Sequence, residues 1–187
     1  MGKKTASADR QREIERLKKK LGYRRCAGVA LFNRQGKIWL GHRKKNSESH
    51  GPDLWQLPQG GIDAGEKPLA AAKRELWEET GVTHARKLEK CRHWLKYDLP
   101  DDILGKGLKG KYRGQKQAWY AFLFDGDDSE INISHPPKGA PVEFDDWRWA
   151  ELPEITDQIV HFKKPVYEEL VRQFGHLPEA IRRGDFD

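Results

Sequence analysis

The stretch that decides the fold lies at residues 60–82 and reads GGIDAGEKPLAAAKRELWEETGV. Apolar side chains recur in it at helical spacing, at Leu69, Ala72 and Leu76. Pro68 suits the first turn of a helix, where its missing N–H costs nothing, and Gly81 can adopt the left-handed conformation that ends one. The pattern therefore predicts a helix from Pro68 to Thr80.

Three glutamates share one face of this predicted helix. Glu75, Glu78 and Glu79 follow one another at positions i, i+3 and i+4, which brings their carboxylates within reach of one another. At about 100° per residue, their face borders the apolar stripe instead of opposing it. Burial of like charges is costly unless a cation compensates, and carboxylate oxygens suit Mg²⁺ or Mn²⁺. A solvated acidic face is the alternative that these three residues alone leave open.

The residues around the glutamates form a longer pattern. Gly60, Glu66, the run Arg74–Leu76, the pair Glu78–Glu79 and Gly81 have the spacing of the Nudix box. The stretch resembles that box at every defining position, which favours the metal site over a solvated face. The resemblance implies an α/β fold, a Nudix-type α/β/α sandwich with a mixed β-sheet. It also implies a hydrolase that acts on phosphoanhydride bonds.

A metal centre is part of what the resemblance implies. The expected ligands are the carboxylates of Glu75, Glu78 and Glu79 and the backbone carbonyl of Gly60. The expected ion is Mg²⁺, with Mn²⁺ or Zn²⁺ as alternatives. Glu78, Glu79 and Glu130 are the candidates for the general base, and Glu130 is also a candidate for a further metal ligand.

Two other residues of the box are expected to have a structural role. Arg74 can form a charge-assisted ion pair with Glu66, which would tie the loop before the helix to the helix itself. Gly60 and Gly61 permit a close backbone approach in the same loop.

Two segments outside the box indicate the substrate. WQLPQGG at residues 55–61 and YRGQKQAWY at residues 112–120 are similar to segments of bacterial RNA pyrophosphohydrolases and dinucleoside polyphosphate hydrolases. The leading hypothesis is removal of pyrophosphate, or of phosphate, from the 5′ end of tri- or diphosphorylated RNA, which leaves a 5′-monophosphate. One alternative is a dinucleoside polyphosphate hydrolase of the Ap4A type. Another is a non-catalytic nucleotide-binding module, although such a module would be expected to have lost box glutamates.

The same resemblance assigns five residues to substrate binding. Arg24, Arg43 and Lys163 supply cations that would contact phosphate oxygens. Phe162 and Tyr97 supply rings that would stack on a base.

The rest of the chain predicts further strands and one more helix. Cys26–Phe32 and Ile38–Leu40 are separated by turn residues and predict a β-hairpin. Further elements are expected as strands at Trp55–Leu57, Lys90–Tyr97, Gln117–Phe124 and Trp147–Trp149, and as a helix at about Pro165–Phe174. The connection between Asp98 and Gln115 is long and basic, which is typical of a binding or mobile loop.

Three regions are expected along the chain. Residues 22–175 are the predicted Nudix hydrolase domain, residues 176–187 a C-terminal tail, and residues 1–21 a basic N-terminal extension. Within the extension, residues 2–9 are expected to be disordered because they are small and polar. Residues 10–21 predict a helix that has too few apolar side chains to anchor itself.

Composition indicates a cytoplasmic protein. No run approaches the roughly 18 apolar residues that span a bilayer, and the start of the chain lacks the apolar core of a secretory signal, so no membrane partner is expected. Cys26 and Cys91 cannot form a disulfide framework and are interpreted as ordinary buried thiols. The net charge of +6 comes from the first 25 residues, which contain ten Lys and Arg against three Asp and Glu. The expected partner is 5′-phosphorylated RNA or a dinucleoside polyphosphate, and the sequence leaves the oligomeric state unknown.

Overall fold

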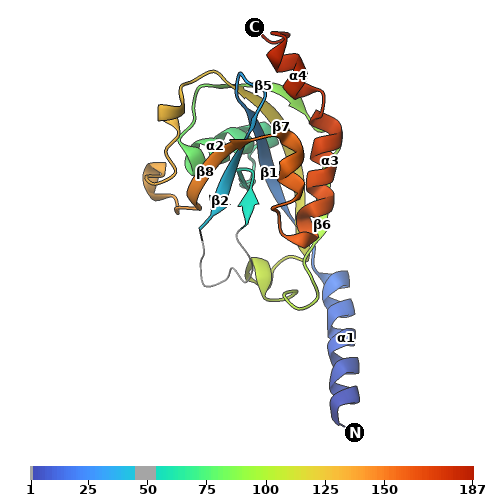
Figure 1. The fold of residues 1–187 in the computed structure, drawn as a ribbon. Coiled ribbons are helices and arrows are strands. Elements are labelled where there is room, and N and C mark those ends of the chain that lie inside the picture. The colour runs from blue at the N-terminus through green and yellow to red at the C-terminus, as the bar shows by residue number, and fades with distance from the viewer. Residues whose placement is uncertain (1, 45–53) are drawn as a thin grey trace.

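The computed structural model describes residues 2–44 and 54–187, in which strands and helices are mixed along the chain (Figure 1). The α-helices are α1 (Gly2–Lys20), α2 (Pro68–Thr80), α3 (Lys164–Phe174) and α4 (Leu177–Arg182). The strands are β1 (Tyr23–Phe32), β2 (Ile38–Arg43), β3 (Trp55–Gln56), β4 (Gln59–Gly61), β5 (Ala85–Lys90), β6 (Leu95–Asp98), β7 (Gly114–Phe124) and β8 (Phe144–Ala150).

All eight strands belong to one mixed sheet. β1 runs parallel to β7 in an unbroken register, from Tyr23 opposite Gly114 to Phe32 opposite Leu123. It also pairs antiparallel with β2 and with β4, while β6 pairs with β7 and β8 with β2. The predicted hairpin is confirmed, because Phe32 at the end of β1 lies opposite Ile38 at the start of β2.

Alternate side chains of β1 point into two different apolar cores. Val29 and Leu31 pack in a cluster with Leu76 of α2, whereas Ala30 and Phe32 belong to the cluster that also contains the buried residues of α3. Because successive side chains of a strand point to opposite faces, α2 and α3 cover the two faces of the sheet. The predicted α/β/α sandwich is therefore confirmed.

Helix α2 has the predicted boundaries. It begins at Pro68 and ends at Thr80. Gly81 follows with φ 77°, in the left-handed region, and its N–H donates to the carbonyl of Trp77. The turn chemistry that the sequence supplies at both ends thus defines the helix on which the glutamates lie.

Two strand predictions need correction. The strand expected at Lys90–Tyr97 is shorter, because it corresponds to β6, which begins only at Leu95. Strand β5 (Ala85–Lys90) shares only Lys90 with that prediction, and the two strands pair separately with β7. The long connection after β6 is tied to the protein by apolar side chains, since Leu99 and Leu104 are buried in the core. Strand β4 was not predicted, because a pair of glycines carries no strand signal.

The N-terminal extension also differs from the expectation. It forms one helix, α1, from Gly2, so the expected disorder of residues 2–9 is wrong, and the helix is anchored near its C-terminal end. Ile14 is 5% exposed and joins the α3-side core. Lys18 forms an ion pair with Asp101 at 2.6 Å, and its carbonyl accepts a hydrogen bond from Arg113 at 2.7 Å. One buried isoleucine and contacts to the loop after β6 supply the anchor that the local sequence lacks.

The last residues pack on the same core. Leu177 and Ile181 of α4 are buried in the α3-side cluster, and α4 lies at the opposite end of the molecule from α1 (Figure 1). The division of the chain into regions at residues 21 and 175 stays a prediction. Cys26 and Cys91 are buried and unpaired, as expected. In the described part of the chain, no helix combines the length and apolar character needed to cross a bilayer.

Replacing Ile14 with aspartate should release α1 from the protein. The substitution removes an apolar contact of about 2 kcal/mol and places a charge in the core, so trypsin should cleave α1 on the order of tenfold faster. Gln11→Asp adds the same charge at an exposed position of the same helix and should not change the rate. Equal rates for both variants would show that Ile14 does not anchor the helix.

Candidate metal and phosphate site

The site begins at the glycine pair of β4. Gly60 and Gly61 lie opposite Ala27 and Cys26 of β1, which places the loop that follows them directly against α2. A Cβ atom on Gly60 would overlap the carboxylate of Glu75. Only glycine therefore allows this carboxylate to lie against the strand.

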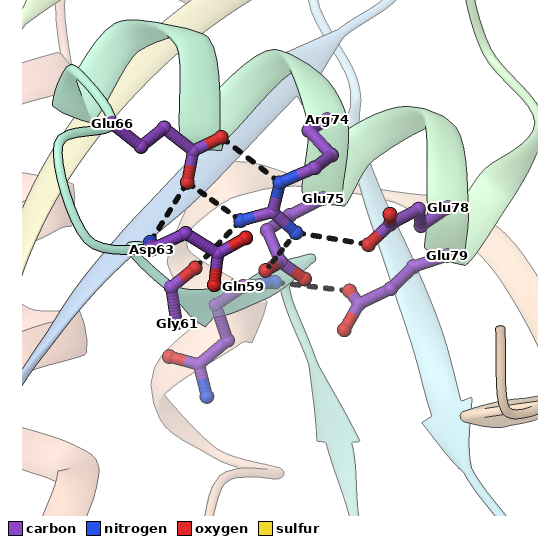
Figure 2. Close-up of polar contacts among 8 residues, drawn as sticks. All are labelled: Gln59, Gly61, Asp63, Glu66, Arg74, Glu75, Glu78 and Glu79. Atoms are coloured by element: carbon purple, nitrogen blue, oxygen red, sulfur yellow. Dashed lines mark hydrogen bonds and ion pairs between the residues drawn. The ribbon is translucent and has the colours of Figure 1, made fainter.

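Arg74 joins the loop to the helix, as predicted. Its Nε and Nη2 donate to the two carboxylate oxygens of Glu66, each at 2.9 Å, and Nη2 also donates to the carbonyl of Gly61 at 2.7 Å (Figure 2). Glu66 in turn accepts the backbone N–H of Asp63 at 2.9 Å, which closes the turn between the strand and the helix. The hydrogen bonds from Arg74 hold the pKa of Glu66 below its usual range.

The same guanidinium reaches two of the box glutamates. Arg74 Nη1 donates to Glu75 at 2.7 Å and to Glu78 at 2.9 Å (Figure 2). Glu75 is only 8% exposed, and burial raises its pKa although Arg74 opposes the shift. Its charge is therefore one that the folded protein must compensate.

Glu79 lies on the next position of the helix and is not bound by Arg74. Its Oε2 accepts the backbone N–H of Gln59 at 3.0 Å, while no hydrogen bond to Oε1 is found within the described residues. Burial raises the pKa of Glu79 well above its usual range, and the charges of Glu75 and Glu143 raise it further. Glu143 was not predicted as a site residue. It directly precedes β8, in the segment PVEFDDW at residues 141–147, whose acidic residues have no helical or metal-ligand spacing.

These carboxylates have the chemistry of a divalent-metal site. In residues 2–44 and 54–187, no three acidic, histidine or cysteine side chains already surround one metal position, since Arg74 holds Glu75 and Glu78. The oxygen donors nevertheless fit a hard cation such as Mg²⁺, because two of them are shielded from water and lack a full counter-charge. The structure brings the three predicted glutamates to one place beside Gly60, which confirms their proximity and not their role as ligands.

Two of the predicted phosphate-binding cations lie next to these carboxylates. Lys163 is 6% exposed, and burial together with the nearby Arg43 lowers its pKa to about 8. The ammonium group lies 3.4 Å from Oε1 of Gln56 and near the charges of Glu79 and Glu143. Within the described part of the chain this buried ammonium group has one weak hydrogen bond, so it is well suited to bind an anion that enters from outside.

Arg43 and Arg24 flank the same region. The Nε of Arg43 is buried and has no hydrogen-bond partner, a state shared by one other side-chain atom in the described chain. Arg43 also offsets part of the pKa shift of Glu79, so the two groups are close. Arg24 lies on β1 against Gly61, and its charge acts on Glu75.

The two predicted stacking residues pack against each other. The rings of Tyr97 and Phe162 are 5.4 Å apart at an interplanar angle of 46°, and the ammonium group of Lys163 lies 5.7 Å from the Tyr97 ring. Tyr97 is buried, whereas Phe162 is half-buried. Phe162 is therefore the ring with a surface available to a ligand.

The segments 55–61 and 112–120 meet at the site. Nε2 of Gln117 donates to the side chains of Gln59 and Gln115, and Oε1 of Gln117 accepts from the indole of Trp119 at 3.2 Å. Parallel pairing of β7 with β1, and antiparallel pairing of β4 with β1, bring these distant segments together. The network orients Gln59, whose backbone N–H binds Glu79.

Glu130 lies elsewhere. Its carboxylate accepts the backbone N–H groups of Thr83 and His84, at 2.5 and 3.0 Å, together with both of their side chains. Burial alone would raise the pKa of Glu130, but these hydrogen bonds lower it to about 2. The structure does not bring it together with the three box glutamates. It closes the connection after α2 instead, and a role as ligand or base receives no support from this position.

Comparison with known families identifies the chain. A model of the NUDIX domain matches residues 22–170. The chain belongs to the Nudix family. Nudix hydrolases generally use a divalent metal ion, which agrees with the chemistry of the carboxylate cluster.

Relatives of this Nudix protein have been named in bacteria. The RNA pyrophosphohydrolase of Rhizobium meliloti (strain 1021) is 56% identical over 160 residues, covering 84% of this chain and 96% of that protein. The RNA pyrophosphohydrolase of Agrobacterium fabrum is 53% identical over 160 residues, covering 84% and 94%. Among solved structures, the E. coli dihydroneopterin triphosphate pyrophosphohydrolase has a TM-score of 0.58 at 15% identity, covering 81% of this chain and 99% of that one, and shows the shared fold.

Glu79 should make the stability of the metal-free Nudix domain depend on pH. Because its folded-state pKa lies above the usual 4.5, the folded state binds that proton more tightly than the unfolded state, so stability falls as pH rises above about 4.5. Glu79→Gln should therefore raise the free energy of unfolding near pH 7 in the presence of a chelator. The gain should vanish near pH 4, as urea unfolding at both pH values would measure.

Glu78→Gln is the matched control. It removes a carboxylate from the same turn but retains Glu79, so the contribution of Glu79 to the pH dependence should remain. Equal gains for Glu79→Gln at both pH values would contradict the assigned shift.

Proposed function

We propose that this Nudix protein removes pyrophosphate from the 5′-triphosphate end of RNA, or phosphate from the diphosphate end, and leaves a 5′-monophosphate. The observation that supports this most directly is the proximity of carboxylates and cations. Glu79, next to Glu75, lies near the charges of the half-buried Arg43 and the buried Lys163. The names of the bacterial relatives, which are 53–56% identical, supply the substrate class.

The carboxylates would hold the metal. Glu75, Glu78, Glu79 and Glu143 supply oxygen ligands, and the carbonyl of Gly60 is a further donor. When bound, a divalent ion makes water a stronger acid and stabilises negative charge on phosphate oxygens. Arg74 would then release Glu75 and Glu78 and keep its hydrogen bonds to Glu66 and to the carbonyl of Gly61.

Glu79 is the preferred general base. Burial makes its carboxylate a stronger proton acceptor than an exposed glutamate, and Oε1 carries no hydrogen bond in the described structure. In the hydrolysis, the oxygen of a water molecule would bond to phosphorus and Glu79 would take a proton of that water. The phosphoanhydride bond next to the α-phosphate would break, so that pyrophosphate leaves a triphosphate end and phosphate leaves a diphosphate end. Glu78 is the alternative acceptor on the same turn.

Cations and one ring would position the RNA end. With a pKa of about 8, Lys163 is mostly protonated near neutral pH, and it lies in reach of phosphate oxygens together with the unpartnered Nε of Arg43. The exposed surface of Phe162 would stack on a base near the 5′ end, supported from behind by Tyr97. These contacts order the substrate and need not change during reaction.

Side-by-side turnover tests the substrate. We expect 5′-triphosphorylated RNA to be hydrolysed to 5′-monophosphorylated RNA and pyrophosphate, in Mg²⁺ or Mn²⁺, with kcat/KM on the order of tenfold or more above that for Ap4A. Chromatography of the released phosphate species distinguishes the products. A preference for Ap4A would replace the proposal with the dinucleoside polyphosphate alternative, and binding of nucleotides without turnover would favour the non-catalytic module.

Two single substitutions test which glutamate outside the box, Glu143 or Glu130, acts at the site. Glu143→Gln removes a charge beside Glu79 and should lower kcat on triphosphorylated RNA by about 10²-fold or more. Glu130→Gln should instead lower the free energy of unfolding by about 1–3 kcal/mol, because it weakens the hydrogen bonds to residues 83–84, and should retain kcat well below the melting temperature. The reverse result would restore Glu130 as the site residue.

A further inference from the structure

Two buried glutamines of β7 lie on the α3 face of the sheet. Gln115 and Gln117 precede Trp119 by four and two residues on the same strand, and Trp119 belongs to the α3-side core. Because side chains two residues apart on a strand point to the same face, all three point toward α3. Gln115 is 8% exposed and Gln117 1% exposed. Their carboxamides therefore need hydrogen-bond partners inside the protein or from a ligand.

The indole of Trp119 determines how these carboxamides are turned. An indole N–H can only donate, so Gln117 directs its Oε1 toward it, at 3.2 Å. The Nε2 of Gln117 then faces away from the indole and donates to Oε1 of Gln115 at 3.0 Å and to Oε1 of Gln59. The oxygen of Gln115 is thus bound to Gln117, and its amide nitrogen points elsewhere.

This amide nitrogen of Gln115 is an unused donor. Within residues 2–44 and 54–187, Nε2 of Gln115 donates no hydrogen bond, although the residue is more than nine-tenths buried. The side-chain atoms that are fully enclosed without a partner in the same residues are the indole nitrogen of Trp39 and Nε of Arg43. The nitrogen of Gln115 therefore remains accessible from outside. An unpaired donor in a buried side chain is unfavourable until an acceptor reaches it.

Gln115 lies between the residues expected to bind phosphate and those expected to bind a base. It is in register with Arg24 of β1 on one side and with Tyr97 of β6 on the other. Residues paired in register point to the same face, and adjacent strands are about 4.8 Å apart, so this row spans about 10 Å. The ring of Tyr97 packs against Phe162. A nucleotide with its phosphate at Arg24 and its base on Phe162 would bring an edge of that base within reach of Gln115.

We infer that Gln115 is a specificity-determining residue, whose carboxamide N–H donates to a keto oxygen on a base near the 5′ end of the RNA. This inference rests on the proposed RNA substrate. Guanine has the acceptor O6 at the position where adenine has an amino group, which is a donor. Two donors that face each other both stay unpaired, and this is costly in a buried site. Gln115 therefore selects guanine over adenine.

Binding of an RNA that has no phosphoanhydride bond tests how the base is recognised. Tetranucleotides with a 5′-monophosphate, the expected product, carry guanosine, inosine or adenosine at position 1 or at position 2, and uridine elsewhere. Anisotropy measures how each displaces a fluorescent RNA. At one of the two positions, the wild type should bind guanosine and inosine alike, and about tenfold more tightly than adenosine. Inosine keeps O6 and lacks the 2-amino group, so it isolates the contact with the keto oxygen.

Two substitutions of Gln115 separate donation from packing. Gln115→Glu keeps the shape and an oxygen for Gln117 but replaces the free donor with an acceptor, so adenosine should bind at least as tightly as guanosine. Gln115→Leu removes the donor without supplying an acceptor, and the preference should fall below about twofold. Comparison of guanosine with adenosine within each variant cancels any general loss of affinity. Gln11→Glu makes the same change at an exposed glutamine and should keep the wild-type preference.

Several results would overturn the assignment. These are a wild type that prefers adenosine or has no preference at either position, a preference for guanosine over inosine, and a preference that Gln115→Leu retains. Uniformly weaker binding of all RNAs by Gln115→Leu, without any preference in the wild type, would place the donor at a phosphate instead of a base. Absence of hydrolysis of triphosphorylated RNA would overturn the proposed function, whereas the binding preference is measured independently of it.

Discussion

The contact between Gly60 and the carboxylate of Glu75 is the constraint on which the site depends. A side chain on Gly60 would occupy the space of that carboxylate, so Glu75 can lie against the strand only because the glycine has none. The approach buries a negative charge, which is unfavourable by itself. Arg74 makes it tolerable, since one guanidinium binds Glu75, Glu66 and the carbonyl of Gly61 at once. The loop and helix are therefore positioned by the same group that compensates the charge.

Charge separation across a short distance follows from this packing. Glu75 and Glu79 form an acidic end, and the half-buried Arg43 and the buried Lys163 form a basic end. Burial disfavours both sets of charges, and each is stabilised only in part by the other. A metal ion and a polyphosphate together would complete both ends, because each supplies the charge that one end lacks. The cost of holding these groups is thus the physical reason to expect affinity for such ligands.

The regions outside the matched domain are held to the fold by buried apolar side chains and by ion pairs. Ile14 joins α1 to the core, and Leu177 and Ile181 do the same for α4. The loop after β6 links the first of these to the sheet, because Asp101 binds Lys18. Buried apolar side chains thus join both terminal segments to the preformed core, and polar contacts add to them.

The sequence by itself determined the helix that carries the three glutamates and the overall architecture. Pro68, the helical spacing up to Leu76 and Gly81 specify α2 through local backbone chemistry, and the spacing of the three glutamates follows from that helix. Only the tertiary structure decided which glutamate from outside the box lies near these three. Glu143 and Glu130 both lie in polar segments with no periodic signal, and their places depend on how β8 pairs with β2 and how the connection after α2 folds back. Such long-range pairings are absent from any local pattern, because they arise from the burial of residues that are far apart in the chain.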